Sequence, residues 1–201
     1  MGKIRELVTW AMLTSAAAGI YLYLDNAKDN VLRNVQARFP EYIARIEQDY
    51  GPLGVKPRIV LKAMDRNTVA RTENLETIAV NTSMYAFISG RDVNKTVNHE
   101  LAHLKFLQIA DSLGVKTYVV KDNIFRYVGG QAVWAVSEGF ADYVSHQQKE
   151  LFMSYPDCFD LVRPVLDRYG TIDGLKKMLL NLPTDQELKD FSSYHMRLGV
   201  R

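Results

Sequence analysis

The segment from Val93 to Leu113 constrains the fold more than any other part of the chain. It contains neither proline nor glycine, and Gly114 follows it directly. Proline and glycine interrupt helices, and a glycine just beyond the last turn commonly ends one. We therefore predict one long helix over this segment, with Asp92 as its N-cap. The pentapeptide His99-Glu100-Leu101-Ala102-His103 lies within it.

The two histidines of this pentapeptide stand four residues apart, so on a helix they share one face, with Cβ atoms about 5–6 Å apart. Two imidazoles placed in this way can bind one zinc ion at Zn–N distances of about 2.0–2.1 Å. Glu100 is rotated by about 100° from His99, beside such an ion. There it can take a proton from a water molecule that the metal has made more acidic. The apolar neighbours of the motif indicate a face next to the core, where unpaired His and Glu side chains are costly.

A second acidic motif follows in Ser137-Glu138-Gly139-Phe140-Ala141-Asp142-Tyr143. We predict a helix from about Gln131 to Phe152, on which Glu138 and Asp142 share a face. Its apolar residues indicate burial, and buried carboxylates need a cation or hydrogen-bond donors. Glu138 can supply the third protein ligand of a catalytic zinc site, and Asp142 can accept the second ring N–H of a ligating histidine. The alternative is an ordinary salt-bridged helix.

H-E-x-x-H followed on a later helix by E-G-x-A-D-Y resembles the gluzincin metallopeptidases. The E-x-x-A-D form is similar to the HtpX and CAAX-prenyl-protease group. The E-G-[FL]-A-[DE]-Y form is similar to small single-domain and aminopeptidase-like gluzincins. The segment between the two motifs is longer than in the thermolysin pattern, so the intervening loop is of another type.

This resemblance implies a zincin-like fold, in which a small β patch packs on a pair of metal-binding helices. It implies that His99, His103 and Glu138 bind Zn2+ and that Glu100 is the general base. By the same resemblance, Asp142 orients one of the histidines. The implied reaction is direct attack of water on a peptide bond, without an acyl-enzyme.

The resemblance also implies a strand edge that holds an extended substrate, for which we choose Thr77 to Met84. The oxyanion of the tetrahedral intermediate needs a donor, which in this clan is a Tyr or His from later in the chain. Tyr194 and His195 are our candidates, and Tyr143 and His146 are the alternatives.

The remaining pattern predicts an α+β, mostly helical protein. Helical spacing over 26–50 is divided by Pro40, which we expect to begin a new helix. A polar loop is expected over 65–76, between two strands. The further elements are strands over 58–62, 77–81 and 116–120, and helices over 155–169, over 171–181 and from the capping box of Thr184 and Glu187 onward.

The N-terminus carries an uncharged, mostly apolar run from Leu7 to Leu24. Its length of about 18 residues is at the lower limit for a membrane-spanning helix. Trp10 stands near one end and tyrosines near the other, as in an interfacial belt. A membrane anchor is the first interpretation; a cleaved signal peptide and a helix packed on the domain are the alternatives. We expect an N-terminal segment over 1–25, a peptidase domain over 26–201, and a membrane-anchored or exported protein rather than a cytoplasmic one.

Charge and cysteine content narrow the class of partner. The net charge is +2 and the basic residues are scattered, which argues against nucleic acid. The single cysteine, Cys158, lacks the surroundings of an activated nucleophile. The two motifs, and the gluzincin resemblance that they carry, lead us to expect a zinc-dependent metallopeptidase that acts on a peptide or protein. The alternatives are a zincin-fold protein that binds zinc as a scaffold without cleaving peptides, and a zinc hydrolase of another kind, such as a deacylase.

Overall fold

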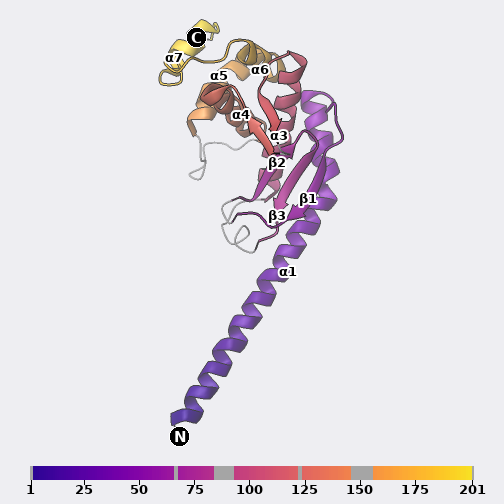
Figure 1. Ribbon diagram of the computed structural model, residues 1–201, viewed down its shortest axis with the longest axis vertical. Helices are drawn as coiled ribbons and strands as arrows, with labels where there is room; N and C mark the ends of the chain where they lie inside the picture. The colour runs from indigo at the N-terminus through magenta and orange to yellow at the C-terminus, as the bar shows by residue number, and fades with distance from the viewer. Residues whose placement is uncertain (1, 66–67, 84–92, 122–123, 146–155, 201) are drawn as a thin grey trace.

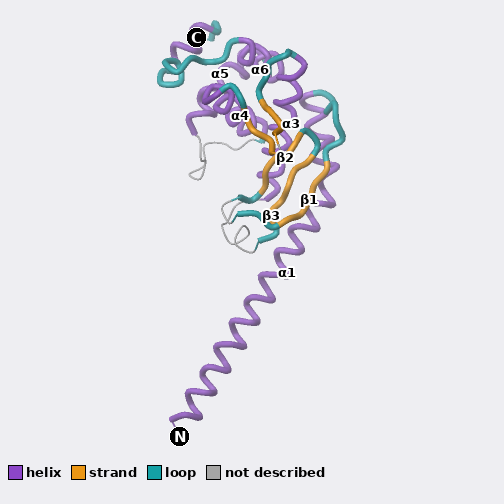
Figure 2. The backbone as a smooth tube through the Cα atoms, viewed as in Figure 1, coloured by secondary structure: helices purple, strands orange, loops and turns teal. Residues whose placement is uncertain are grey.

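The computed structural model is a mainly helical α+β protein, whose described strands form one three-stranded sheet and a separate two-stranded hairpin (Figure 2). It describes residues 2–65, 68–83, 93–121, 124–145 and 156–200. Within these ranges, the side chains of 2–24, 120–121, 124–127 and 156 are not described. The predicted α+β class is therefore confirmed.

Helix α1 runs from Gly2 to Tyr50 without a break. Its N-terminal half projects away from the other elements, and its C-terminal half packs against them (Figure 1). The expectation that Pro40 begins a new helix is wrong. An interior proline costs about 3 kcal/mol, but apolar side chains on both sides of Pro40 are buried on one face and offset that cost. They are Leu32, Val35, Phe39, Tyr42 and Ile46.

The sheet has three strands in the order β1-β3-β2. Strand β3 (Thr77–Asn81) is parallel to β1 (Arg58–Lys62) and antiparallel to β2 (Ala70–Asn74). The strands predicted over 58–62 and 77–81 are confirmed. The loop predicted over 65–76 is partly wrong, because it contains β2. The sequence of β2, Ala-Arg-Thr-Glu-Asn, has too few apolar side chains to identify a strand.

Strand β3 is the central strand, and each of its five residues is buried. Both of its edges are paired, so it has no edge to offer to a peptide. The choice of Thr77 to Met84 as the substrate-binding edge is therefore wrong over 77–81, and Met84 itself lies outside the described residues. The strand that lies at an edge and contacts the histidine-bearing helix is β2.

Helix α3 (Val93–Ser112) confirms the long helix predicted from the sequence. It ends in a Schellman motif, in which the N–H of Gly114 bonds the carbonyl of Asp111 and that of Val115 bonds the carbonyl of Ala110, each at 2.9 Å. Gly114 has a φ of +67°, which glycine adopts without strain. The expected N-cap, Asp92, lies outside the described residues. Helix α3 contacts α1, α4 and β2, and so lies at the centre of the domain.

Helix α4 (Gly130–Val144) packs between α3 and helix α5 (Pro156–Tyr169). The predicted continuation of α4 to Phe152 falls largely on residues outside the description. Gly139, which lowers the helix propensity of this segment, has a packing role. A Cβ atom there would lie 2.1 Å from the carbonyl oxygen of Cys158 and 2.6 Å from Val162 Cγ2. The glycine thus allows α4 and α5 to approach closely.

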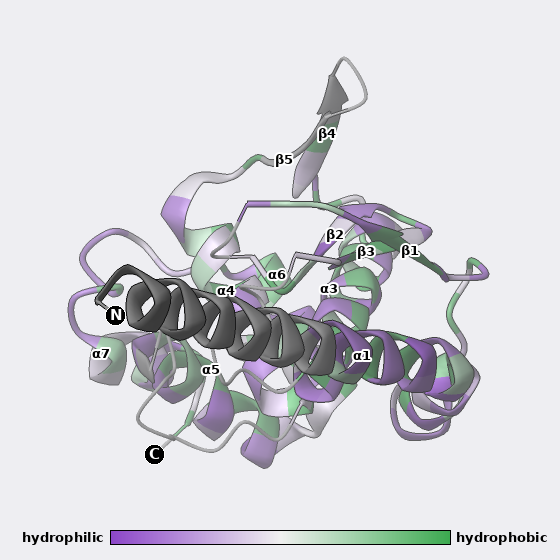
Figure 3. Ribbon diagram, turned by 90° about the horizontal axis from the view of Figure 1, so that it is seen from below, coloured by the Kyte–Doolittle hydropathy of each residue, from purple (hydrophilic) through white to green (hydrophobic). Residues whose placement is uncertain are grey.

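The strands β4 (Tyr118–Lys121) and β5 (Ile124–Tyr127) form an antiparallel hairpin between α3 and α4. Figure 3 shows this hairpin projecting beyond the sheet and the helices, while its strand β5 still contacts β2 and α4. The strand predicted over 116–120 is thus present, shifted toward the C-terminus.

The C-terminal region contains helices α6 (Thr171–Leu180) and α7 (Phe191–Arg197). The capping box of Thr184 and Glu187 is present, with the N–H of Thr184 bonding Glu187 Oε2 at 2.8 Å and the N–H of Glu187 bonding Thr184 Oγ1 at 3.3 Å. The residues after it form a turn, so the helix predicted from Thr184 is wrong at its start. Asp190 accepts from the N–H of Ser192 and caps α7 instead.

Within the part of the chain whose side chains are described, no helix is long and apolar enough to cross a membrane. The apolar run over 7–24 belongs to α1, and its side chains lie outside that part.

Candidate metal centre

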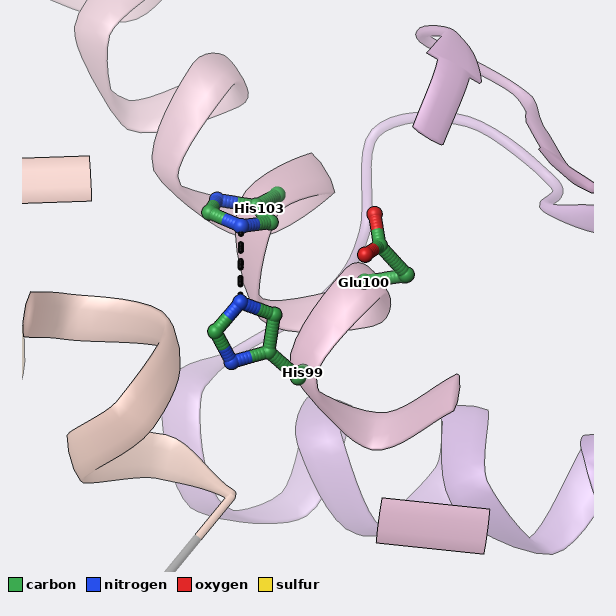
Figure 4. Close-up of side chains that lie close together, drawn as sticks. All are labelled: His99, Glu100 and His103. Atoms are coloured by element: carbon green, nitrogen blue, oxygen red, sulfur yellow. Dashed lines mark hydrogen bonds between the residues drawn. The ribbon is translucent and has the colours of Figure 1, made fainter. Parts of the chain in front are cut away.

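The two histidines of α3 face each other across one turn of the helix (Figure 4). Their Nε2 atoms are 3.0 Å apart, and the ring planes meet at 84°. His103 is buried, and the side chain of His99 is 14% exposed. The spacing of four residues therefore brings the two ring nitrogens to one point at the edge of the core, as the sequence predicts.

Helix α4 supplies three polar side chains around this pair. Glu138 places one carboxylate oxygen 3.3 Å from Nε2 of His99 and the other 3.6 Å from Nε2 of His103. Asp142 lies 3.1 Å from Nδ1 of His99, and Ser137 Oγ lies 2.9 Å from Nδ1 of His103. Each imidazole thus has Nε2 directed toward Glu138 and Nδ1 toward a different polar group of the same helix.

Burial and neighbouring charges shift the pKa values of the two histidines in opposite directions. Burial alone lowers the pKa of His99, but the contacts with Asp142 and Glu138 outweigh it and raise that pKa to about 10. For His103, burial and the neighbouring positive charge of His99 together lower the pKa to about 3. The two carboxylates thus favour the protonated form of His99, whereas burial beside His99 favours the neutral form of His103. A neutral imidazole is the form that binds a metal, so metal binding by His99 requires the loss of any such proton.

The carboxylate of Glu138 is ionised in this arrangement. Burial acts to raise its pKa, but the hydrogen bond from His99 holds the pKa below its ordinary value. An anionic carboxylate therefore faces two ring nitrogens, with a different oxygen near each, and carboxylate and imidazole are donors that suit a divalent cation such as zinc.

The distances between these donor atoms provide a geometric test. In a tetrahedral zinc site with bonds of about 2.0–2.1 Å, neighbouring donor atoms are about 3.3 Å apart. Here the separation is 3.0 Å between the two nitrogens, and 3.3 and 3.6 Å from the nitrogens to the Glu138 oxygens. The two oxygen distances belong to different oxygens of Glu138, so the carboxylate lies close enough to share one metal ion with both histidines, through either oxygen.

Glu100 lies on the side of α3 that faces the sheet. Ligand atoms of His99, Glu100 and His103 all lie within 4.8 Å of one another, so this His-Glu-His group could hold a metal ion. The Oε2 atom of Glu100 accepts a hydrogen bond from the backbone N–H of Thr72 at 2.6 Å and lies 2.9 Å from the Thr72 hydroxyl. Burial raises the pKa of Glu100, although the charge of His99 and the bonds from Thr72 act in the opposite direction.

Aromatic packing holds the two motif-bearing helices together behind the site. The ring of Phe140 on α4 packs against Phe106 of α3 and against Tyr50 at the end of α1, with centroids 6.4 and 6.5 Å apart. Because Phe140 stands two residues after Glu138, this packing fixes the position of α4 relative to the histidines.

Tyr194 and His195 are not brought to the histidine pair. Both lie on α7, which packs against α5. The side chain of Tyr194 is fully buried there, and Nε2 of His195 bonds the carbonyl of Leu161 at 2.9 Å. The alternative donor Tyr143 bonds Asp167 on α5 at 2.8 Å, and His146 lies outside the described residues.

Two residues that contact the site, Ser137 and Thr72, were not predicted from the sequence. Ser137 gave a signal that could have been read, since a small polar residue beside Glu138 on an apolar helix needs a partner. Thr72 gave none, because its strand was expected to be a loop. For Cys158, burial and the charges of Glu138 and Asp142 raise the pKa of the thiol to about 12, which disfavours the nucleophilic thiolate at neutral pH.

No protein-family model, no curated protein and no solved structure matches the chain. Functional assignment therefore depends on the chemistry of the site itself.

Proposed function

We propose that the protein is a zinc-dependent metallopeptidase with a zincin-like domain of the gluzincin type. One observation carries this proposal: the carboxylate of Glu138, from α4, faces both Nε2 atoms of the histidine pair of α3, at 3.3 and 3.6 Å. Helices α3 and α4 would thus contribute the three ligands, His99, His103 and Glu138, that a catalytic zinc site requires.

The surroundings of the two glutamates favour different roles for them. Glu138 is directed toward the nitrogens of both histidines, as a ligand must be. Glu100 has one oxygen engaged by the edge strand β2, which suits a base that stands beside the metal. A raised pKa also suits a carboxylate that must accept a proton and then release it.

Zinc, when bound, would supply Lewis acidity toward water and toward the substrate carbonyl. The chain's own residues do the rest. Glu100 takes the proton of the attacking water and delivers it to the leaving amine. Asp142 and Ser137 fix the orientation of the two imidazoles through their Nδ1 atoms.

An extended peptide fits this domain best along β2. It is an edge strand, it contacts α3, and its Thr72 touches Glu100. A peptide that adds to a strand edge gains main-chain hydrogen bonds without requiring a particular side chain. A strand edge beside the histidine-bearing helix supports a peptide or protein substrate over a deacylase, which a tunnel or deep pocket would favour.

The scaffold alternative has one observation in its favour. The candidate oxyanion donors Tyr194 and His195 lie on α7, against α5. Zinc binding without cleavage would support a scaffold role.

The N-terminal run over 7–24 supports an anchor or an export signal, because its uncharged length reaches the lower limit for a span. We propose that the protein acts at a membrane or outside the cytoplasm.

The test combines metal content with cleavage. Purified full-length protein is loaded with zinc and analysed by mass spectrometry, and its activity is measured on a fluorogenic peptide library. We expect about one zinc per chain, loss of metal and activity in Glu138→Ala, and loss of activity alone in Glu100→Gln. Glu41→Ala, which removes an exposed acid from α1, is the matched control and keeps both. A wild type that holds no zinc refutes the whole proposal, and one that holds zinc without cleaving any peptide supports the scaffold.

A further inference from the structure

Thr72 connects the edge strand of the sheet to Glu100. Its backbone N–H donates to Glu100 Oε2 at 2.6 Å. Its hydroxyl lies 2.9 Å from the same carboxylate oxygen and 3.1 Å from the main-chain oxygen of Glu100. Thr72 thus contacts both the side chain and the backbone of a single residue.

The local structure of β2 makes this contact available. Thr72 pairs with Ile78 of β3, and the register shifts between Thr72 and Asn74. An amide of an edge strand that does not bond its neighbour points outward. The N–H of Thr72 is such an amide, and it bonds α3 instead of another strand.

Two donors on one oxygen restrict a carboxylate strongly. A Glu side chain has three rotatable bonds, so Glu100 has many orientations in the absence of a partner. Fixing Oε2 from two directions sets the plane of the carboxylate and hence the direction of Oε1. A general base must hold its oxygen within hydrogen-bond reach of the proton that it abstracts.

We propose that Thr72 is a positioning residue that holds the Glu100 carboxylate in its catalytic orientation. This inference rests on the proposed peptidase function. The backbone N–H contributes to the orientation whatever side chain stands at this position, whereas the hydroxyl contributes only in Thr or Ser. The hydroxyl is therefore the part that mutation can test.

The experiment compares Thr72→Val with Thr72→Ser in the zinc-loaded full-length protein. Valine keeps the branched shape and the strand preference of threonine but has no hydroxyl, and serine restores it. For the best-cleaved peptide of a fluorogenic library, we expect kcat to fall about tenfold in Thr72→Val. KM and zinc content stay unchanged, and Thr72→Ser returns kcat to within about twofold of wild type, since it keeps the hydrogen bond.

Thr77→Val is the matched control, because it removes a hydroxyl from the neighbouring strand β3 that bonds Arg58 rather than Glu100. It leaves kcat unchanged. A melting curve of each variant separates unfolding from loss of positioning. If Thr72→Val unfolds, the inference stands or falls on Thr72→Ala compared with Thr72→Ser under conditions where both are folded.

The outcomes distinguish the two proposals. An active wild type whose kcat is unaffected by Thr72→Val overturns the positioning role and leaves the peptidase proposal intact. A fall in kcat that serine does not restore overturns it as well, because it assigns the effect to packing. A zinc-loaded wild type without peptidase activity refutes both.

Discussion

Replacement of Gly139 by alanine tests the close approach of α4 and α5 that positions Glu138. The added Cβ would lie 2.1 Å from the carbonyl oxygen of Cys158, whereas ordinary contact begins at 3.4 Å. The backbone of α5 would have to retreat by about 1.3 Å, the difference between those two distances. A carbonyl oxygen in a helix cannot rotate out of the way, so the strain falls on the packing of both helices.

The expected loss of stability follows from two opposing effects. Overpacking of a core costs about 1–3 kcal/mol and occasionally more, and the obstacle here is backbone, which places Gly139→Ala at the upper end. Alanine also gains about 1 kcal/mol of helix propensity over glycine. We expect a net loss of about 2 kcal/mol, which corresponds to a melting temperature lower by about 4–8 °C for a chain of this length.

Chemical denaturation with urea, followed by circular dichroism, measures this loss. The matched control is Gly54→Ala, since a Cβ at Gly54 meets no atom within 4 Å. We expect the control to change the free energy of unfolding by less than about 0.5 kcal/mol. If Gly139→Ala is as stable as Gly54→Ala, α4 and α5 do not approach each other as described. The position of Glu138, which depends on that packing, is then refuted as well.

Two further predictions concern the metal centre and the C-terminal turn. Ser137→Ala removes the group at Nδ1 of His103, so we expect zinc affinity to fall about tenfold or more; competition with a chelator measures this, and unchanged affinity would show that Ser137 does not orient the ring. Bonds from Arg197 and Thr184 lower the pKa of Glu187 to about 2, below its value of about 4.3 in an unfolded chain. These bonds stabilise the folded state fully above about pH 4.3, and this stabilisation is lost as the pH falls toward about 2. Urea midpoints at pH 6 and pH 3 should therefore differ less in Glu187→Gln than in wild type, and equal differences would contradict this.

The sequence predicted the parts of the fold that local chemistry determines. The helix that carries His99 and His103 has a stop signal in Gly114 and an unbroken run of helix-forming residues, and both are local features. The sequence could predict that Glu138 lies near those histidines, because a buried carboxylate needs a partner. Strand β2 could not be found in this way, since it is held by pairing with β3 and by Thr72 rather than by apolar side chains. The role of Thr72 was hidden for the same reason.

Long-range packing explains the errors as well. Pro40 is a local signal for a helix start, yet the burial of Phe39 and Tyr42 on either side of it keeps α1 continuous. Tyr194 and His195 were chosen for their chemistry and their place late in the chain. Nothing local to them could reveal that α7 packs against α5.

The unbroken course of α1 has a mechanical consequence. A helix rises about 1.5 Å per residue and resists bending over a few turns. Because α1 is continuous, it connects the N-terminal segment to the domain as a stiff rod and not as a flexible linker. From residue 24 to Leu32, the first of its buried residues described above, the rod is about 12 Å long. If the run over 7–24 lies in a bilayer, the domain stands close to that surface with one fixed side toward it. The length of α1 would then fix the height of the candidate site above the membrane. Only substrate segments that pass within a few nanometres of the membrane could enter the site.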